Sequence, residues 1–203
     1  MNTSGIHPVF NRIMNRADKE KLLRQKAKVI WITGLSGAGK TTLASGIEQE
    51  LNIRGHLTQV LDGDNIRMGI SNDLGFSEND RYENIRRIAE VSKLFLNCGI
   101  ITINCFISPT REIREMAGSI IGREDFIEVY LSASLEVCEQ RDTKGLYTKA
   151  RRGEIKNFTG IDSPFEPPVN PAITIDSGIL TIEETRQRLL ELVLPLVKDV
   201  CTI

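Results

Sequence analysis

Five short apolar runs are spread along the chain, and each is followed by a stretch with helical periodicity. Apolar runs of this length are typical of buried strands, and β-branched residues dominate the third run. The runs are KVIWIT at 28–33, LTQVL at 57–61, IITINCF at 100–106, FIEVYL at 126–131 and AITI at 172–175. Strands that alternate with helices predict a three-layer α/β fold, with a parallel five-stranded sheet and helices on both faces.

Polar residues at characteristic positions mark where helices begin. The SEND segment from Ser77 and the TIEE segment from Thr181 have the capping-box pattern of a helix start. Ser108 is expected to be an N-cap, with Pro109 at the first helical position. Helices are predicted at about 40–53, from 77 to about 99, after 109, after 134 and from 181 onward. One stripe of the second of these helices carries Ile85, Ile88, Ala89, Ser92, Phe95 and Leu96.

In a sheet built from right-handed βαβ units, the carboxyl ends of the strands lie along one edge. Four segments that follow strands are therefore expected to meet there: the glycine-rich turn at 34, DGDNIR at 62–67, residues 107–111 and residues 142–171. Residues 1–27 are polar and of mixed charge, and they predict an N-terminal arm or short helix outside the core. Residues 28–203 are expected to form one domain.

The composition is that of an ordinary globular domain. Of the 203 residues, 40% are hydrophobic and 26% are charged, and a formal net charge of -1 gives no reason to expect binding to nucleic acid or to a membrane. With only His7 and His56, a histidine-based triad or a multi-histidine metal site is not expected. We expect a cytoplasmic protein, because no apolar stretch spans a bilayer and the cysteines lack zinc-site spacing. These cysteines are Cys98, Cys105, Cys138 and Cys201.

The segment GLSGAGKTT fits the pattern GxxxxGK[ST] of phosphate-binding loops, directly between a predicted strand and a predicted helix. Phosphates require backbone N–H groups that point inward, and glycine lets the chain curl that tightly. Lys40 is expected to reach the β- and γ-phosphates of ATP, and the Thr41 hydroxyl is expected to hold Mg²⁺. The predicted ATP-binding residues are Gly34, Leu35, Ser36, Gly37, Ala38, Gly39, Lys40, Thr41 and Thr42.

Two other segments on the same edge carry charge suited to phosphoryl transfer. In an extended DGDNIR segment, Asp62 and Asp64 would point to the same side, where they can hold metal-bound water or accept a proton. The alternative is a solvated turn after a strand. Residues 142–171 concentrate positive charge, which predicts a basic lid over the phosphates; the alternative is a solvated basic loop. An NKxD element for guanine recognition is absent from the sequence, which favours a kinase over a GTP-dependent switch.

From about residue 20 to 197 the chain resembles the adenylylsulfate (APS) kinase family. The resemblance rests on GLSGAGKTT, LDGDNIR, LGFSENDRYENIRR, FISPTR and DTKGLYTKARRGEIKNFTGIDSPFEPP, and on their order. It implies a homodimeric enzyme of sulfate assimilation that phosphorylates the 3′-hydroxyl of APS with ATP and Mg²⁺, giving PAPS and ADP. Two alternatives stay open: a related kinase with another nucleotide-like acceptor, and a nucleotide-dependent regulatory module.

The resemblance also implies roles for individual residues at the acceptor. Phe76 and Phe158 match positions that sandwich the adenine, where stacking suits a flat base, although each is also suited to anchoring a loop or the core. Positions that hold the phosphosulfate are matched by Arg67, Arg81 and Lys156. Asn84 matches a further APS contact, and the alternative for it is an exposed helix position.

At the reacting groups, the resemblance implies Asp64 as the acid nearest the 3′-hydroxyl and Mg²⁺, with Asp62 supporting it. Ser108 matches a serine proposed as a phosphoserine intermediate, and the alternatives are N-capping and substrate contact. Arg141 is implied as an ATP contact. With Lys40, these residues complete the predicted catalytic and ATP-binding set.

Overall fold

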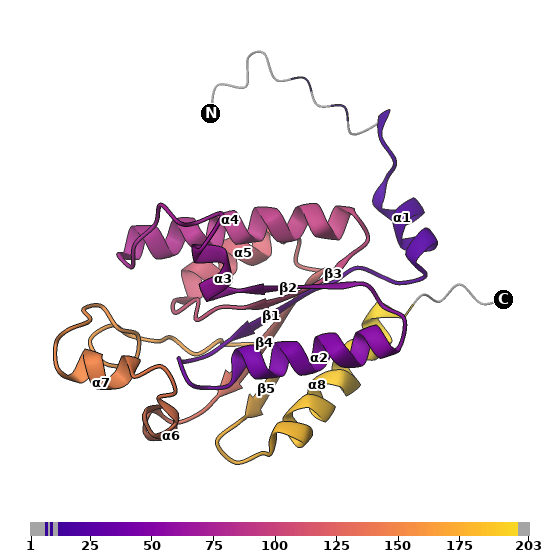
Figure 1. The fold of residues 1–203 in the computed structure, drawn as a ribbon. Helices are drawn as coiled ribbons and strands as arrows, with labels where there is room; N and C mark the ends of the chain where they lie inside the picture. The colour runs from indigo at the N-terminus through magenta and orange to yellow at the C-terminus, as the bar shows by residue number, and fades with distance from the viewer. Residues whose placement is uncertain (1–6, 8, 10–11, 199–203) are drawn as a thin grey trace.

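The computed structural model describes residues 7, 9 and 12–198, and its centre is a five-stranded sheet in which every strand pairing is parallel. The strand order is β2-β3-β1-β4-β5 (Figure 1). The strands are β1 (Val29–Thr33), β2 (Thr58–Asp62), β3 (Ile101–Cys105), β4 (Phe126–Ser132) and β5 (Ile173–Asp176). The predicted sheet and all five of its strands are confirmed.

Helices cover both faces of the sheet and complete the predicted three layers (Figure 1). They are α1 (Arg16–Leu23), α2 (Lys40–Ile53), α3 (Gly63–Arg67), α4 (Glu78–Asn97), α5 (Arg111–Ile121), α6 (Leu135–Arg141), α7 (Leu146–Arg151) and α8 (Ile182–Val197). Buried side chains of α2 and α8 pack on one face, and those of α3, α4 and α5 pack on the other. In the part of the chain that the structure describes, no helix is long and apolar enough to cross a membrane.

The central strand β1 shows why the apolar run had no alternating pattern. Its residues are all fully buried, because helices lie above and below it. Ile30 and Ile32 pack with the α2 and α8 side chains, whereas Val29 and Trp31 pack with those of α4 and α5. The centre of the Trp31 ring lies 5.8 Å from the centre of the Phe106 ring, and this packing holds the end of β3 beside β1.

The helix starts agree with the sequence at two caps and differ at a third. Ser77 and Thr181 both form complete capping boxes, as predicted. The prediction that Ser108 caps the next helix is wrong: Thr110 is the N-cap of α5, and its side chain accepts from Ile113 N. The hydroxyl of Ser108 is buried at the sheet edge instead, where it bonds to Trp31 and Thr33.

The segment before β1 is bound to the domain at the edge where the strands begin. Gln25 is fully buried, and its side-chain nitrogen donates to Leu57 O (3.0 Å) and Gly99 O (2.7 Å). Ala27 is part of the core on the α4 face. The expectation that residues 1–27 lie outside the core is therefore wrong for the end of this arm. Cys201 lies outside the described residues.

Candidate active site

The predicted phosphate loop connects β1 to α2, and two of its glycines are required by close packing. A Cβ on Gly34 would lie 2.3 Å from Leu131 O of β4, and a Cβ on Gly37 would lie 2.9 Å from Cys138 O of α6. Gly37 also has φ = 76°, a conformation that other residues rarely adopt. The loop is thus seated on β4 and α6, and it leads directly into the N-terminus of α2, where helices favour anions.

Carbonyl groups of the loop are held by side chains from other elements. Tyr147 OH of α7 donates to Ser36 O (2.9 Å), and Ser177 Oγ, after β5, donates to Ala38 O (2.8 Å). Lys40 Nζ donates to Gly34 O (2.9 Å) and Leu35 O (2.7 Å). These bonds fix the loop from three sides, so its shape is built into the fold.

Burial lowers the pKa of the Lys40 ammonium to about 8, although the nearby thiols and Asp62 act in the opposite direction. A lysine in this environment has lost part of its hydration, so it gains more from an anionic partner than an exposed lysine does. Its position beside the loop carbonyls is suited to the terminal phosphates of ATP.

Asp62, the last residue of β2, is the carboxylate that contacts the phosphate loop. Its Oδ2 accepts from Thr41 Oγ1 (2.8 Å) and from Cys105 Sγ (3.3 Å), while its Oδ1 accepts from Asp64 N (3.0 Å). Burial raises the pKa of Asp62, but these hydrogen bonds outweigh it and hold the pKa below its usual range. A carboxylate and a hydroxyl side by side supply the oxygen ligands that Mg²⁺ prefers, so the residues present fit this ion.

The expectation that DGDNIR is an extended segment is wrong. Asp62 caps the short helix α3, and Asp64 lies in the first turn of that helix. The Asp64 side chain is exposed and forms an ion pair with Lys144 of the 142–171 segment. Lys144 is one of the basic residues whose crowding in that segment predicts a lid, but the sequence does not pair it with Asp64.

Ser108 is in a strained and buried position. It has φ = 39°, it is 2% exposed, and its hydroxyl accepts from Trp31 Nε1 (3.1 Å) and donates to Thr33 Oγ1 (3.0 Å). Its carbonyl accepts from Arg114 Nη1 (2.7 Å). Strain of this kind persists only where the surroundings enforce it. The hydroxyl therefore serves the local fold in this structure.

Two predicted acceptor residues lie against each other after β2. The Arg67 guanidinium carbon is 4.4 Å from the centre of the Phe76 ring, a cation–π contact. Arg67 Nη1 also donates to Leu74 O (3.1 Å) and Gly75 O (2.7 Å). Phe76 remains 62% exposed, so a face of its ring is accessible to a flat ligand.

Arg81 joins the start of α4 to the 142–171 segment. Its guanidinium donates to Phe76 O (3.0 Å), Thr159 Oγ1 (2.8 Å) and Asn157 O (2.5 Å). One helical turn further along α4, Asn84 is buried, and its Oδ1 has no hydrogen-bond partner in the described part of the chain. A buried unpaired amide oxygen is rare in proteins, and it fits a position that contacts a ligand.

Phe158 and Lys156 differ in how the structure presents them. Phe158 is 8% exposed and meets Tyr147 edge to face, with 4.9 Å between the ring centres. Lys156 is exposed. A surface groove is lined by residues 160–165 on one side, and by Leu35 of the phosphate loop and Leu135 of α6 on the other. The 142–171 segment thus lies against the phosphate loop, and it contains a short helix, α7, that the sequence did not predict.

Arg141, at the end of α6, also contacts the phosphate loop. Its Nη2 donates to Ser177 O (2.6 Å), and its Nη1 is 3.5 Å from Gly37 O. The side chain is exposed, and its place between Gly37 and Ser177 is consistent with the predicted ATP contact.

The comparisons with known proteins agree with this geometry. The sequence model of the family described as adenylylsulphate kinase matches residues 26–176. The chain belongs to the adenylylsulfate kinase family. It is 63% identical over 190 residues to the adenylyl-sulfate kinase of Bacteroides thetaiotaomicron, with 94% of each chain covered. The Bacteroides fragilis enzyme of the same name is 61% identical over 192 residues, with 95% of each chain covered.

Among solved structures, the chain resembles the APS kinase of Mycobacterium tuberculosis in complex with AMPPNP and APS. The TM-score is 0.80 at 44% sequence identity, and the match covers 83% of this chain and 98% of that one. The match covers most of the chain, so this adenylylsulfate kinase family member has the fold of a family enzyme whose structure was solved in complex with AMPPNP and APS.

Sequence reasoning missed one buried residue of this family member's site region. Arg114 of α5 is 2% exposed, and it donates to Glu128 Oε1 (2.8 Å), Ser108 O (2.7 Å) and Glu166 O (2.6 Å). It therefore ties the strained Ser108 and the end of the lid to β4. This role could not be predicted from the sequence, because the contacts with Glu128 and Glu166 join residues that are far apart in the chain. The expected helix start at Pro109 also gave no reason to connect Arg114 with Ser108.

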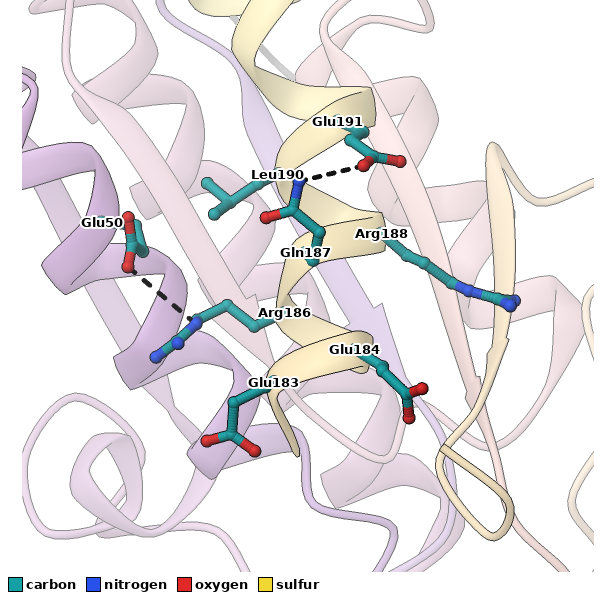
Figure 2. A pocket seen from close by; sticks show the side chains of 8 residues that line it. All are labelled: Glu50, Glu183, Glu184, Arg186, Gln187, Arg188, Leu190 and Glu191. Atoms are coloured by element: carbon teal, nitrogen blue, oxygen red, sulfur yellow. Dashed lines mark hydrogen bonds and ion pairs between the residues drawn. The ribbon is translucent and has the colours of Figure 1, made fainter. Parts of the chain in front are cut away.

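A second groove lies between α2 and α8 (Figure 2). Mostly charged side chains line it, and some of the polar groups pair with one another: Arg186 Nε is 4.0 Å from Glu50 Oε1, and Gln187 Nε2 donates to Glu191 Oε1 (2.9 Å). Glu50 is ten residues beyond Lys40, or about 15 Å along the helix. The adenylylsulfate kinase site is therefore separate from this groove.

Proposed function

We propose that the protein transfers the γ-phosphoryl group of ATP to the 3′-hydroxyl of adenosine 5′-phosphosulfate, giving PAPS and ADP. The observation that carries the proposal is the position of Asp62. Its carboxylate contacts Thr41 of the phosphate loop, and it also caps α3, the helix that bears Arg67. Through Asp62, the phosphate loop on the donor side is therefore in contact with the start of the helix that bears the acceptor residue Arg67. An in-line transfer requires the donor and the acceptor to lie next to each other in this way.

On the donor side, residues 34–42 hold the triphosphate with backbone N–H groups at the start of α2, and Lys40 neutralises the terminal phosphates. Thr41 and Asp62 would hold Mg²⁺, whose chemistry is to neutralise charge that develops on the phosphoryl oxygens. Arg141 contacts the nucleotide beside Gly37. In this assignment Asp62 is the main carboxylate ligand of Mg²⁺, because its Oδ2 lies 2.8 Å from Thr41 Oγ1.

On the acceptor side, Asp64 receives the proton of the 3′-hydroxyl, and Lys144 compensates the charge next to it. The adenine stacks between Phe76 and Phe158, with Asn84 as a further contact. The phosphosulfate is held by Arg67, Arg81 and Lys156, whose donors suit its oxyanions. The transfer is direct, and Ser108 holds the strand end rather than carrying a phosphoryl group.

The segment 142–171 acts as a lid that excludes water from the transfer. Its contacts with α4 and the phosphate loop, through Arg81 and Tyr147, support this role. We also propose that the protein works in the cytoplasm as a homodimer. The described cysteines Cys98, Cys105 and Cys138 are all unpaired, which suits a reducing compartment.

The experiment that tests the function is a coupled assay of ADP release, with APS compared against other nucleotides and against no acceptor. We expect turnover that depends on APS at micromolar concentrations. Turnover with another nucleotide but not with APS would indicate a different acceptor, and slow hydrolysis without any acceptor dependence would indicate a regulatory module. Lys40→Ala is expected to abolish turnover, and Arg81→Ala is expected to raise the KM for APS more than that for ATP.

A further inference from the structure

The loop between α3 and α4 is held onto α4 by one arginine. Arg87 Nη1 donates to Asp73 Oδ1 (2.6 Å) and Nη2 donates to Asp73 Oδ2 (2.9 Å), so the guanidinium grips the carboxylate with both arms. Nη1 also donates to Ile70 O (2.9 Å), and Nε donates to Glu83 Oε1 of α4 itself (2.9 Å). This fork geometry is stronger and more directional than an ordinary surface ion pair.

The same loop supports the two acceptor residues that lie in contact. The carbonyls of Leu74 and Gly75 accept from Arg67, and the Arg67 guanidinium lies over the ring of Phe76. A shift of the loop would therefore move both the partners of Arg67 and the ring next to them. Arg87 itself makes its loop contacts at Ile70 and Asp73.

Apolar packing does little to hold this loop. Met68 is 85% exposed and Ile70 49% exposed, whereas Leu74 is half-buried. The backbone N–H groups of the loop donate to carbonyls of α3 or of the loop itself, and not to α4. A segment with few buried contacts opens locally at low cost unless polar groups fasten it. The Arg87 fork thus connects residues 70–73 to the helix α4, and Arg81 of the same helix bonds further along, to Phe76 O.

We propose that Arg87 is a positioning residue for the acceptor: it fastens residues 70–75 to α4, and through them it sets the geometry of Arg67 and Phe76. The proposal rests on the proposed function, because it assumes that Arg67 and Phe76 receive the acceptor. It assigns to Arg87 no contact with either substrate.

Arg86 provides a matched control for this role. It has the same side chain, it is adjacent on α4, and its ion pairs are with Glu83 and Glu90 of the same helix. Arg87→Ala is expected to raise the KM for APS about three- to tenfold, with kcat and the KM for ATP changed less than about twofold. Arg86→Ala is expected to leave all three constants within about twofold.

Two further variants test the fork itself. Asp73→Asn should raise the KM for APS in the same direction, and combining it with Arg87→Ala should add little, since both remove one interaction. Arg87→Lys keeps the charge but cannot bridge both carboxylate oxygens, so it should resemble Arg87→Ala more than the wild type.

A second measurement does not depend on activity. Amide hydrogen exchange within residues 68–76 should accelerate in Arg87→Ala and not in Arg86→Ala. Equal exchange in the two variants, or equal effects of Arg87→Ala on the KM values for APS and ATP, would overturn the proposal. If the wild type shows no APS-dependent turnover, the proposed function fails, while the exchange experiment still decides whether Arg87 fastens the loop.

Discussion

Replacing Ser108 with alanine separates a structural hydroxyl from a phosphoryl carrier. The Ser108 hydroxyl is the acceptor for the indole N–H of Trp31, which is fully buried. Thr33 Oγ1 loses less, because it also donates to Ile107 O at 2.6 Å. The cost of the substitution is therefore mainly one buried donor without a partner, or about 1–3 kcal/mol.

The expected loss of stability is measured by urea or thermal unfolding. A cost of about 2 kcal/mol corresponds to a fall in Tm of about 4–8 °C for a domain of this size. Trp31→Phe removes the donor itself, so Ser108→Ala should cost about 1 kcal/mol less in the Trp31→Phe background than alone. Additive effects in this double-mutant cycle would contradict the assigned hydrogen bond.

Turnover of the same variant tests the direct transfer. If the hydroxyl only supports the end of β3, Ser108→Ala should keep kcat within about tenfold of the wild type when assayed well below its Tm. A loss of a thousandfold or more in a variant that is still folded would refute this reasoning. Recovery of labelled phosphate on Ser108 during turnover would refute it as well.

Three other predictions follow from charges in the structure. Burial lowers the pKa of Lys40 to about 8, so its ammonium is present below that pH and lost above it. The Kd for ATP measured by calorimetry should therefore rise between about pH 8 and 10, and a flat profile would argue against the lowered pKa. Asp62→Asn should raise the Mg²⁺ concentration needed for half-maximal rate about 10- to 100-fold, whereas an effect confined to Asp64→Asn would give the metal to Asp64. Burial raises the pKa of Asp125, but Arg16 and Lys28 outweigh it and hold the pKa below its usual range; its stabilisation is thus present at neutral pH and lost as the pH falls below about 4. Arg16→Ala should therefore lower the Tm at pH 7 more than at pH 3, and an equal loss at both would contradict the ion pair.

Much of the fold follows from short-range patterns in the sequence. The five strands have apolar runs because the sheet is covered on both faces, and the capping boxes at Ser77 and Thr181 use side chains that are only three residues apart. The phosphate loop is equally local, since its glycines, lysine and threonine all lie within residues 34–41. Such features need no knowledge of tertiary contacts.

The errors lie where a tertiary partner outweighed a local preference. Ser108 has the sequence context of an N-cap, but Trp31 and Thr33 take its hydroxyl, and Thr110 caps the helix instead. DGDNIR has the composition of a turn, yet from Gly63 on it forms the short helix α3, and the Asp62 carboxylate that caps this helix also bonds to Thr41 of the phosphate loop.

The missed contacts have a similar cause. The ion pair between Asp64 and Lys144 joins residues 80 positions apart, and only the fold brings them together. The same holds for the contact of Arg114 with the end of the lid, 52 positions away. Composition indicated a basic lid, but it could not assign a partner to each charge.

The residues proposed for the donor and those proposed for the acceptor lie in different parts of the chain, and this affects how such a domain can change its acceptor specificity. The proposed phosphate loop connects β1 to α2, whereas most of the proposed acceptor residues belong to one continuous stretch, residues 64–84, that begins after β2; Lys156 and Phe158 of the lid are the others. Substitutions within residues 64–84 would therefore change most of the proposed acceptor contacts and leave the residues of the phosphate loop unchanged. A graft of this stretch from a kinase with another acceptor is therefore a compact route to retargeting, provided that Asp62 keeps its bond to Thr41.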